Sequence, residues 1–286
     1  MSENFGSPSP IQPLSIGNVV SAGMRLYRSH LKLYLKLALT AYVWALLPIY
    51  GWAKCASILA IISRLAFGEL VNQPESIEES RRVVNSRLWQ FLILGLIMFA
   101  VGIGLIAILV IPFSFFIGIT ISYFATNTAV GNNLNPTFIV IGLLLTIIFF
   151  PVLLTFLLLL QARFFVVDLP LAIEDDVDGV STISRSWDLT KRQGWRIVGI
   201  LFIGYLITLP IQLPFSIVSS IIQSYLKPLS KENITYAILS AFVSIVLTIL
   251  SATLVVPFWQ AIKAVIYYDL RSRREGLGLK LRDREI

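Results

Sequence analysis

The part of the sequence most able to bind a metal ion is a run of carboxylates at Glu174, Asp175, Asp176 and Asp178. Oxygen ligands from such side chains suit a divalent cation. The same residues stand just before a basic segment that begins at Arg185, and carboxylates at the start of a helix cap its free N–H groups and complement its dipole. We therefore favour a structural role for this cluster and predict no metal site.

Covalent and acid–base chemistry has little support in the sequence. There is one histidine, His30, and one cysteine, Cys55, so an internal disulfide is excluded and few ligands for a transition metal exist. His30 stands between Arg28 and Lys32, which suits a residue at a membrane surface better than a catalyst. Because no acid and base converge, we expect no enzymatic activity and no cofactor.

Two charged side chains, Arg163 and Lys263, fall close to long apolar runs. An ionisable group at membrane depth is costly, so a role in a polar pathway between helices is one hypothesis. Both residues also precede an aspartate, Asp168 and Asp269 respectively, near the end of their run. Snorkelling to the interface or pairing with a carboxylate is the stronger interpretation, and the polar pathway is its alternative.

The elements that must position these residues are membrane-spanning helices. Hydrophobic residues make up 56% of the 286 residues and charged residues only 14%, with a mean hydropathy of +0.80, whereas soluble domains carry about 25% charged residues. Several uncharged runs reach the ~20 residues that a helix needs to cross a bilayer. The sequence therefore predicts an all-α polytopic membrane protein with about six spans, at 33–48, 50–67, 90–116, 137–164, 196–219 and 236–266.

The distribution of Lys and Arg predicts the orientation of these spans, because cytoplasmic loops accumulate basic residues. Basic residues precede the first, third and fifth spans and fill the tail after residue 270, whereas the connection 126–136 carries no charge. Both termini are therefore expected in the cytoplasm, with the spans in the inner (cytoplasmic) membrane or an internal membrane. This orientation needs a hairpin turn at 48–52; one long kinked helix over 33–67 is the alternative.

A polar, helix-forming stretch stands before each pair of spans, starting near Leu14, Ser76 and Val180. This repetition predicts three hairpins, each introduced by an amphipathic interfacial helix. Ser76 and Glu79 have the spacing of a capping box, in which each side chain accepts a hydrogen bond from the other residue's backbone. We expect a disordered tail at 1–13, a helical membrane domain at 14–270 and a basic cytoplasmic tail at 271–286.

The sequence has a formal charge of +7 but no separate basic domain, so nucleic acid is not an expected partner. Lys and Arg beside a membrane attract anionic lipid head groups, each contributing about 1 kcal/mol. The basic stripes and the tail are predicted to contact anionic lipid of the bilayer or another membrane protein subunit. The candidate residues are Arg25, Arg28, Lys32, Lys36, Arg185, Arg192, Arg196, Arg271, Arg273 and Arg274.

Prolines lie in or beside every predicted span, among them Pro151, Pro210 and Pro257. Broken helices form the midplane binding sites of many transporters, but prolines are also common in membrane helices that only kink and pack. Polar side chains near the spans are expected to bridge neighbouring helices, namely Gln161, Gln212, Gln223 and Gln260.

Parts of the sequence resemble a known family. The segments are PLSIG at 13–17 with RLYR at 25–28, SRSWDLT at 184–190 and YDLRSRREGL at 268–277, and together they are similar to bacterial six-span proteins grouped with the glycerophosphoryl diester phosphodiesterase membrane domain. The resemblance covers most of the chain from residue 13 and implies a helical membrane module. In some relatives a soluble phosphodiesterase domain holds the chemistry; that domain uses histidines and metal-binding carboxylates, and this sequence has only His30.

These patterns together favour a non-enzymatic membrane module. We expect a scaffold, accessory or assembly factor for membrane components, whose basic cytoplasmic face contacts anionic lipid or a partner protein. A lipid or small-solute carrier that uses the proline-kinked helices is the alternative.

Overall fold

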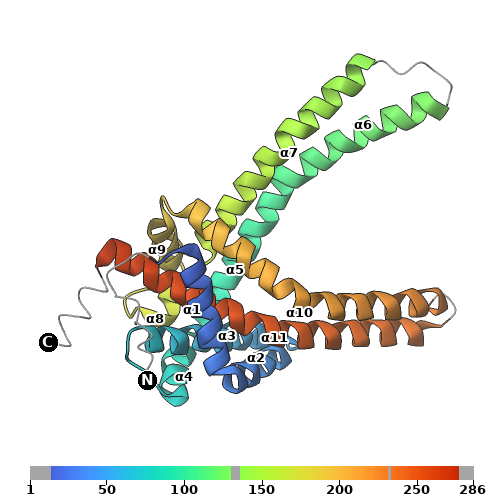
Figure 1. The fold of residues 1–286 in the computed structure, drawn as a ribbon. Helices are drawn as coiled ribbons and strands as arrows, with labels where there is room; N and C mark the ends of the chain where they lie inside the picture. Colours follow the sequence, from blue (N-terminus) through green and yellow to red (C-terminus); the bar gives the residue numbers. More distant parts are fainter. Residues whose placement is uncertain (1–13, 130–135, 231–232, 277–286) are drawn as a thin grey trace, which may run out of the picture. The chain divides into compact units, whose positions relative to one another are not determined.

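The structure, a computed structural model, describes residues 14–129, 136–230 and 233–276, and every regular element in these ranges is helical (Figure 1). The chain divides into two compact units, one of residues 93–161 and one of the residues before and after them. Within the described ranges, four helical segments are long and apolar enough to cross a membrane: Leu88–Thr126, Thr146–Ile173, Gly194–Leu229 and Ile234–Glu275. The prediction of an all-helical fold is confirmed for the described residues, and the six predicted spans are not confirmed.

The first helix, α1 (Ile16–Ser29), packs closely on the last helix, α11 (Ile234–Glu275). It begins at Ser15, whose Oγ accepts a hydrogen bond from the Asn18 N–H at 3.2 Å. At Gly23 a Cβ would lie only 2.7 Å from Ile262 Cγ1 and 3.2 Å from its Cα, so glycine allows the two backbones to approach. The Tyr27 hydroxyl extends this contact by donating to the Leu254 carbonyl at 2.9 Å.

Helices α2 (Leu31–Ala45) and α3 (Tyr50–Leu70) are separate helices that pack against each other and against α11. The chain turns between them at residues 46–49, which overlaps the turn expected at 48–52, so 33–67 is not one kinked helix. A Cβ at Gly51 would lie 2.0 Å from the Trp44 carbonyl oxygen. The turn therefore depends on a residue without a side chain at this position.

Helix α3 lies in the core of its unit, with most of one face buried against α11. Ser63 of α3 donates to Oε1 of Gln260 at 2.7 Å, and both side chains are buried. Gln260 therefore bridges two helices, as predicted from the sequence.

Two further short polar helices precede the longer ones, α4 (Ile77–Ser86) and α9 (Ser181–Thr190). Ser76 caps α4 by accepting from the Glu79 N–H at 3.1 Å, which is one half of the expected capping box. With α1 they match the polar stretches predicted near Leu14, Ser76 and Val180. The one-and-a-half-turn helix α8 (Asp168–Ile173) was not predicted.

The unit of residues 93–161 holds most of α5 (Leu88–Leu105), the π-helical turn Ile106–Val110, α6 (Ile111–Ala129) and most of α7 (Pro136–Phe164). The π turn comes just before Pro112, a residue with no N–H to donate. The Phe113 ring of α6 lies 5.2 Å from that of Phe149 in α7, so these two helices pack side by side. Residues 130–135 of the predicted uncharged connection lie outside the described residues.

The last two helices, α10 (Gly194–Leu229) and α11, form a long hairpin (Figure 1). Gln223 of α10 donates to Ser244 of α11 at 3.2 Å, a second predicted glutamine bridge. Helix α11 passes the expected domain boundary at residue 270 and ends at Glu275, where Gly276 takes a left-handed conformation with φ of 64°. The predicted disordered segment 1–13 and residues 277–286 of the predicted tail lie outside the described residues.

Candidate functional site

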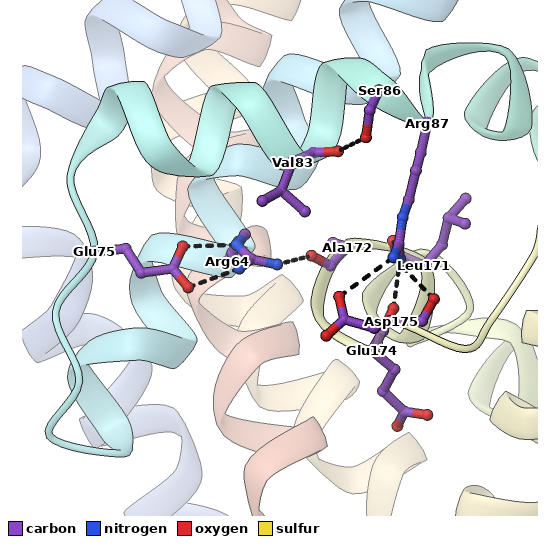
Figure 2. A network of polar contacts seen from close by, with 9 residues as sticks. All are labelled: Arg64, Glu75, Val83, Ser86, Arg87, Leu171, Ala172, Glu174 and Asp175. Atoms are coloured by element: carbon purple, nitrogen blue, oxygen red, sulfur yellow. Dashed lines mark hydrogen bonds and ion pairs between the residues drawn. The ribbon is translucent and has the colours of Figure 1, made fainter.

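Two arginines bind the carbonyl groups at the C-terminal end of α8 (Figure 2). Arg64 of α3 donates to the Ala172 carbonyl at 2.6 Å and holds the Glu75 carboxylate with two bonds of 2.6 and 2.7 Å. Ser80 of α4 donates to the same carboxylate at 2.9 Å. Because the last carbonyls of a helix have no intrahelical donor and carry partial negative charge, a guanidinium stabilises this end.

Arg87, between α4 and α5, binds the same C-terminal end of α8 from the side opposite to Arg64 (Figure 2). Its guanidinium donates to the Leu171 carbonyl at 3.1 Å, to the Asp175 carbonyl at 3.0 Å and to the Glu174 carbonyl. We call this set, Arg64, Glu75, Arg87 and the backbone of 171–175, the α8 corner. It ties α3, α4 and the start of α5 to the segment that follows α7.

The side chain of Glu174 continues these contacts toward α9 and α11. Its carboxylate accepts from Arg185 at 3.0 to 3.2 Å and from the Tyr267 hydroxyl. Arg185 also pairs with Glu275, which in turn binds Arg271 at 2.9 Å. Burial alone would lower the pKa of Arg185, but hydrogen bonds and charge from Glu174 and Glu275 raise it above its usual range.

A second charged centre forms around Asp269, whose side chain is only 3% exposed. Asp269 accepts from the Leu14 N–H at 3.0 Å, from Arg196 at 2.6 Å and from Arg273 at 2.9 Å. Both arginines also donate to the Leu14 carbonyl. The start of the described chain, the first turn of α10 and the end of α11 are thereby joined by compensated charges.

The candidate lipid-contact residues thus fall into two groups. Arg185, Arg196, Arg271 and Arg273 are in internal ion pairs, and Arg274 donates to the Lys191 carbonyl. The other group is exposed and has no carboxylate within ion-pair distance among the described residues: Arg25, Arg28, Lys32, Lys36 and Arg192.

Arg25 and Arg28 line a groove of about 620 Å³ between α1 and α10. The two guanidiniums come from consecutive turns of α1, since residues three apart share a helix face. The apolar part of the wall comes from Val20, Met24 and Ile207, and the Ser21 and Ser29 side chains complete it. We call this the basic groove. A phosphate group beside an acyl chain matches both halves of its lining.

The charged residues expected near membrane depth have protein partners. Lys263 binds both carboxylate oxygens of Asp168, at 2.9 and 3.1 Å. It does not pair with Asp269, although Asp269 is nearer to it in the sequence. The Arg163 guanidinium lies 5.2 Å from the centroid of the Trp187 ring. Its Nη1 is buried and has no hydrogen-bond partner among the described residues.

The carboxylates of the acidic cluster make structural contacts and do not form one shared metal-binding centre. Asp178 accepts from the backbone N–H groups of Val180 and Ser181 at 3.0 and 2.7 Å and so caps α9. Backbone and side-chain hydrogen bonds from Ser181, followed by the bond from Val180, lower the pKa of Asp178. Among the described residues, no group of three or more His, Cys, Asp or Glu side chains could hold a metal ion.

Sequence reasoning missed Arg64, Glu75 and Arg87 as members of a connected site. Arg64 falls inside the predicted span 50–67, and a charged residue within an apolar run is itself a signal of a buried polar contact. Glu75 and Arg87 lie in polar segments without any comparable signal.

His30, which was expected at the membrane interface, contacts Glu69 of α3. The distance from its Nε2 to the Glu69 carboxylate is 2.9 Å. Burial raises the pKa of the Glu69 carboxyl, and the charge of His30 partly lowers it.

Comparison with known proteins places the chain in a family. The model of a family described as a domain of unknown function, DUF7847, matches residues 76–270. No curated protein and no solved structure matches the chain. The matched segment includes Arg87, the backbone of 171–175, Arg185 and Asp269, whereas Arg64 and Glu75 of the α8 corner precede it. It spans well over half of the 286 residues. The chain therefore belongs to the DUF7847 family of domains of unknown function.

Proposed function

We propose that this protein is a non-enzymatic membrane module that binds anionic lipid at its basic groove. The observation that carries the proposal is the pairing of exposed, uncompensated Arg25 and Arg28 with the apolar wall formed by Val20, Met24 and Ile207. Cationic side chains beside the hydrocarbon boundary attract anionic head groups, while the apolar wall suits the upper part of an acyl chain.

A scaffolding role is supported by how the remaining arginines are used. Arg64, Arg87, Arg185 and Arg196 bind carboxylates or helix-end carbonyls within the protein. Their contacts fix the ends of several helices relative to one another, which is what a scaffold or assembly factor for membrane components requires. The resemblance to the glycerophosphoryl diester phosphodiesterase membrane domain is part of this proposal, because that domain is a helical module whose relatives hold catalysis in a separate domain.

The proposed setting is a bacterial inner membrane, or an internal membrane, with both termini in the cytoplasm. Six crossings would require α2 and α3 to cross the bilayer, but the 15 residues of α2 extend only about 22 Å at 1.5 Å per residue, less than the ~30 Å hydrocarbon core. We propose instead that α2–α3 enters the bilayer and returns to the same side. This arrangement keeps the basic segments around Arg28 and Arg81 in the cytoplasm.

A carrier of lipid or small solute is the second candidate function. It is favoured by one observation, a cavity between α10 and α11 next to Pro210 and Pro214. Prolines interrupt helical hydrogen bonding, and interrupted helices form binding sites in transporters.

Native mass spectrometry in mild detergent tests the lipid proposal. The wild-type protein should retain phosphatidylglycerol in preference to phosphatidylcholine, and the Arg25→Gln/Arg28→Gln variant should lose this preference. At about 1 kcal/mol for each basic residue, affinity should fall roughly 30-fold. The matched control is Arg81→Gln/Arg82→Gln, since these arginines are also exposed but lie on α4, outside the groove. Equal retention by both variants would refute the assignment.

A further inference from the structure

A second groove, lined by hydrogen-bonding groups, lies between α10 and α11. Its volume is about 620 Å³, and its polar wall consists of Gln212, Ser216, Ser219, Ser220, Thr248 and Ser251. The rest of the wall is apolar and includes Leu213 and Leu247. No Lys, Arg, Asp or Glu lines it. We call it the hydroxyl groove; it is the cavity next to Pro210 and Pro214 that favours the carrier function, and it shares no residue with the basic groove. A ligand bound here is therefore separate from the anionic lipid proposed for the basic groove.

Part of the polar wall is satisfied within the helices. Ser216 donates to the Leu213 carbonyl at 2.9 Å, Thr248 donates to the Ser244 carbonyl at 2.8 Å, and Ser219 accepts from Gln223 at 3.0 Å.

Three groups of the wall are not satisfied in this way. Gln212, Ser220 and Ser251 form no side-chain hydrogen bond within the part of the chain that the structure describes. A glutamine amide alone offers two donors and one acceptor, and each serine hydroxyl offers both.

The position of the groove along α10 makes these unmet hydrogen bonds costly. Gln212 lies 16 residues after Arg196 and 15 residues before Lys227, and no charged residue lies between them. At 1.5 Å per residue, it is about 24 Å and 22 Å from the two charged ends, near the middle of an apolar stretch that exceeds the thickness of the hydrocarbon core. Bulk water is absent at this depth, so the Gln212 amide needs another partner.

We propose that the hydroxyl groove binds the head of one uncharged glycerolipid, such as a diacylglycerol. The glycerol hydroxyl and the ester carbonyls supply the donor and acceptors that Gln212, Ser220 and Ser251 lack. The apolar wall with Leu213 and Leu247 accommodates the acyl chains. A phospholipid is disfavoured because its charged head would be desolvated in the bilayer centre without any counter-charge from the groove.

Photo-crosslinking of the full-length protein in nanodiscs tests the proposal. The probe is a diacylglycerol with a photoreactive group near the glycerol, and the label is located by mass spectrometry of peptides. In the wild type the label should fall within residues 209–220 or 247–256, and unlabelled diacylglycerol should displace it while phosphatidylglycerol should not. Labelling only outside these segments, or displacement by phosphatidylglycerol, would overturn the proposal, and neither result depends on a variant folding.

A matched pair of variants tests the residues. In Gln212→Leu/Ser220→Ala/Ser251→Ala, labelling should fall at least about tenfold, because each lost hydrogen bond weakens binding several-fold. The control, Ser224→Ala/Ser240→Ala, removes two hydroxyl groups from the same two helices outside the groove and should label normally. Undiminished labelling of the first variant overturns the proposal. So does an efficient disulfide between two chains carrying Ser216→Cys, since a second copy would then fill the groove.

Discussion

At the scale of single residues, Glu174 and Glu275 have a common function that their sequence positions only suggested. Each follows an aspartate by six residues, Asp168 and Asp269, in two segments that look alike. In the structure both glutamates bind one guanidinium, that of Arg185, while the two aspartates bind different cations. The two glutamates therefore join α9 to the end of α11 through Arg185.

A charge-removing substitution at Glu174 tests this structural role. Glu174→Gln preserves the volume but weakens the acceptor for Arg185 and Tyr267 in a site that is 16% exposed. We expect a loss of about 1–3 kcal/mol in the free energy of unfolding, measured by thermal unfolding in detergent. The exposed neighbour Asp176, which has no partner among the described residues, provides the control Asp176→Asn. A destabilisation no larger than that of the control would contradict the structural role.

At the scale of elements, α2 and α3 form a hairpin whose tip is apolar and exposed. Leu46, Ile49 and Trp52 are 59%, 60% and 52% exposed, although the other parts of α3 are largely buried. In water such a cluster would be unfavourable, whereas in lipid it is solvated. This exposure supports the proposal that the tip is the part of the hairpin that enters the bilayer.

Cysteine labelling distinguishes an inserted tip from a crossing. In a Cys55→Ser background, which removes the single native cysteine, Ile49→Cys should react with a membrane-impermeant maleimide from neither side, because the re-entrant tip lies within the hydrocarbon. Gln73→Cys, an exposed position after α3, should react from the cytoplasmic side and shows that the reagent reaches the protein. Labelling of Ile49→Cys from outside would establish the crossing and refute the re-entrant hairpin.

At the scale of the whole molecule, the basic residues predict one cytoplasmic face. In the same Cys55→Ser background, Glu79→Cys on α4 should be labelled only after the membrane is permeabilised. Ser230→Cys, which follows the last residue of α10, should be labelled on intact cells, because an odd number of the four candidate spans separates the two positions along the chain. External labelling of Glu79→Cys would reverse the proposed orientation.

Local sequence signals predicted local structure well. The cap at Ser76, the turn near Gly51 and the three polar helices follow from a hydroxyl acceptor, a missing side chain and a change of polarity along the chain. Four glutamines, Gln161, Gln212, Gln223 and Gln260, were predicted to bridge neighbouring helices. Gln223 and Gln260 bridge helices, whereas Gln212 does not bond to any described residue, because only the rotation of each helix decides which polar side chain faces a neighbour.

The sequence by itself determined that this protein is helical and has helices long and apolar enough to cross a membrane, since both properties follow from its apolar composition and the length of its uncharged runs. Only the tertiary structure decided which charges are available to a ligand. Arg25 and Arg196 look equivalent in a charge pattern, yet Arg196 is compensated by Asp269, 73 residues away, and Arg25 faces a groove. The physical reason is that ion pairing depends on distances of a few ångströms between helices, and no periodicity along the chain records those distances.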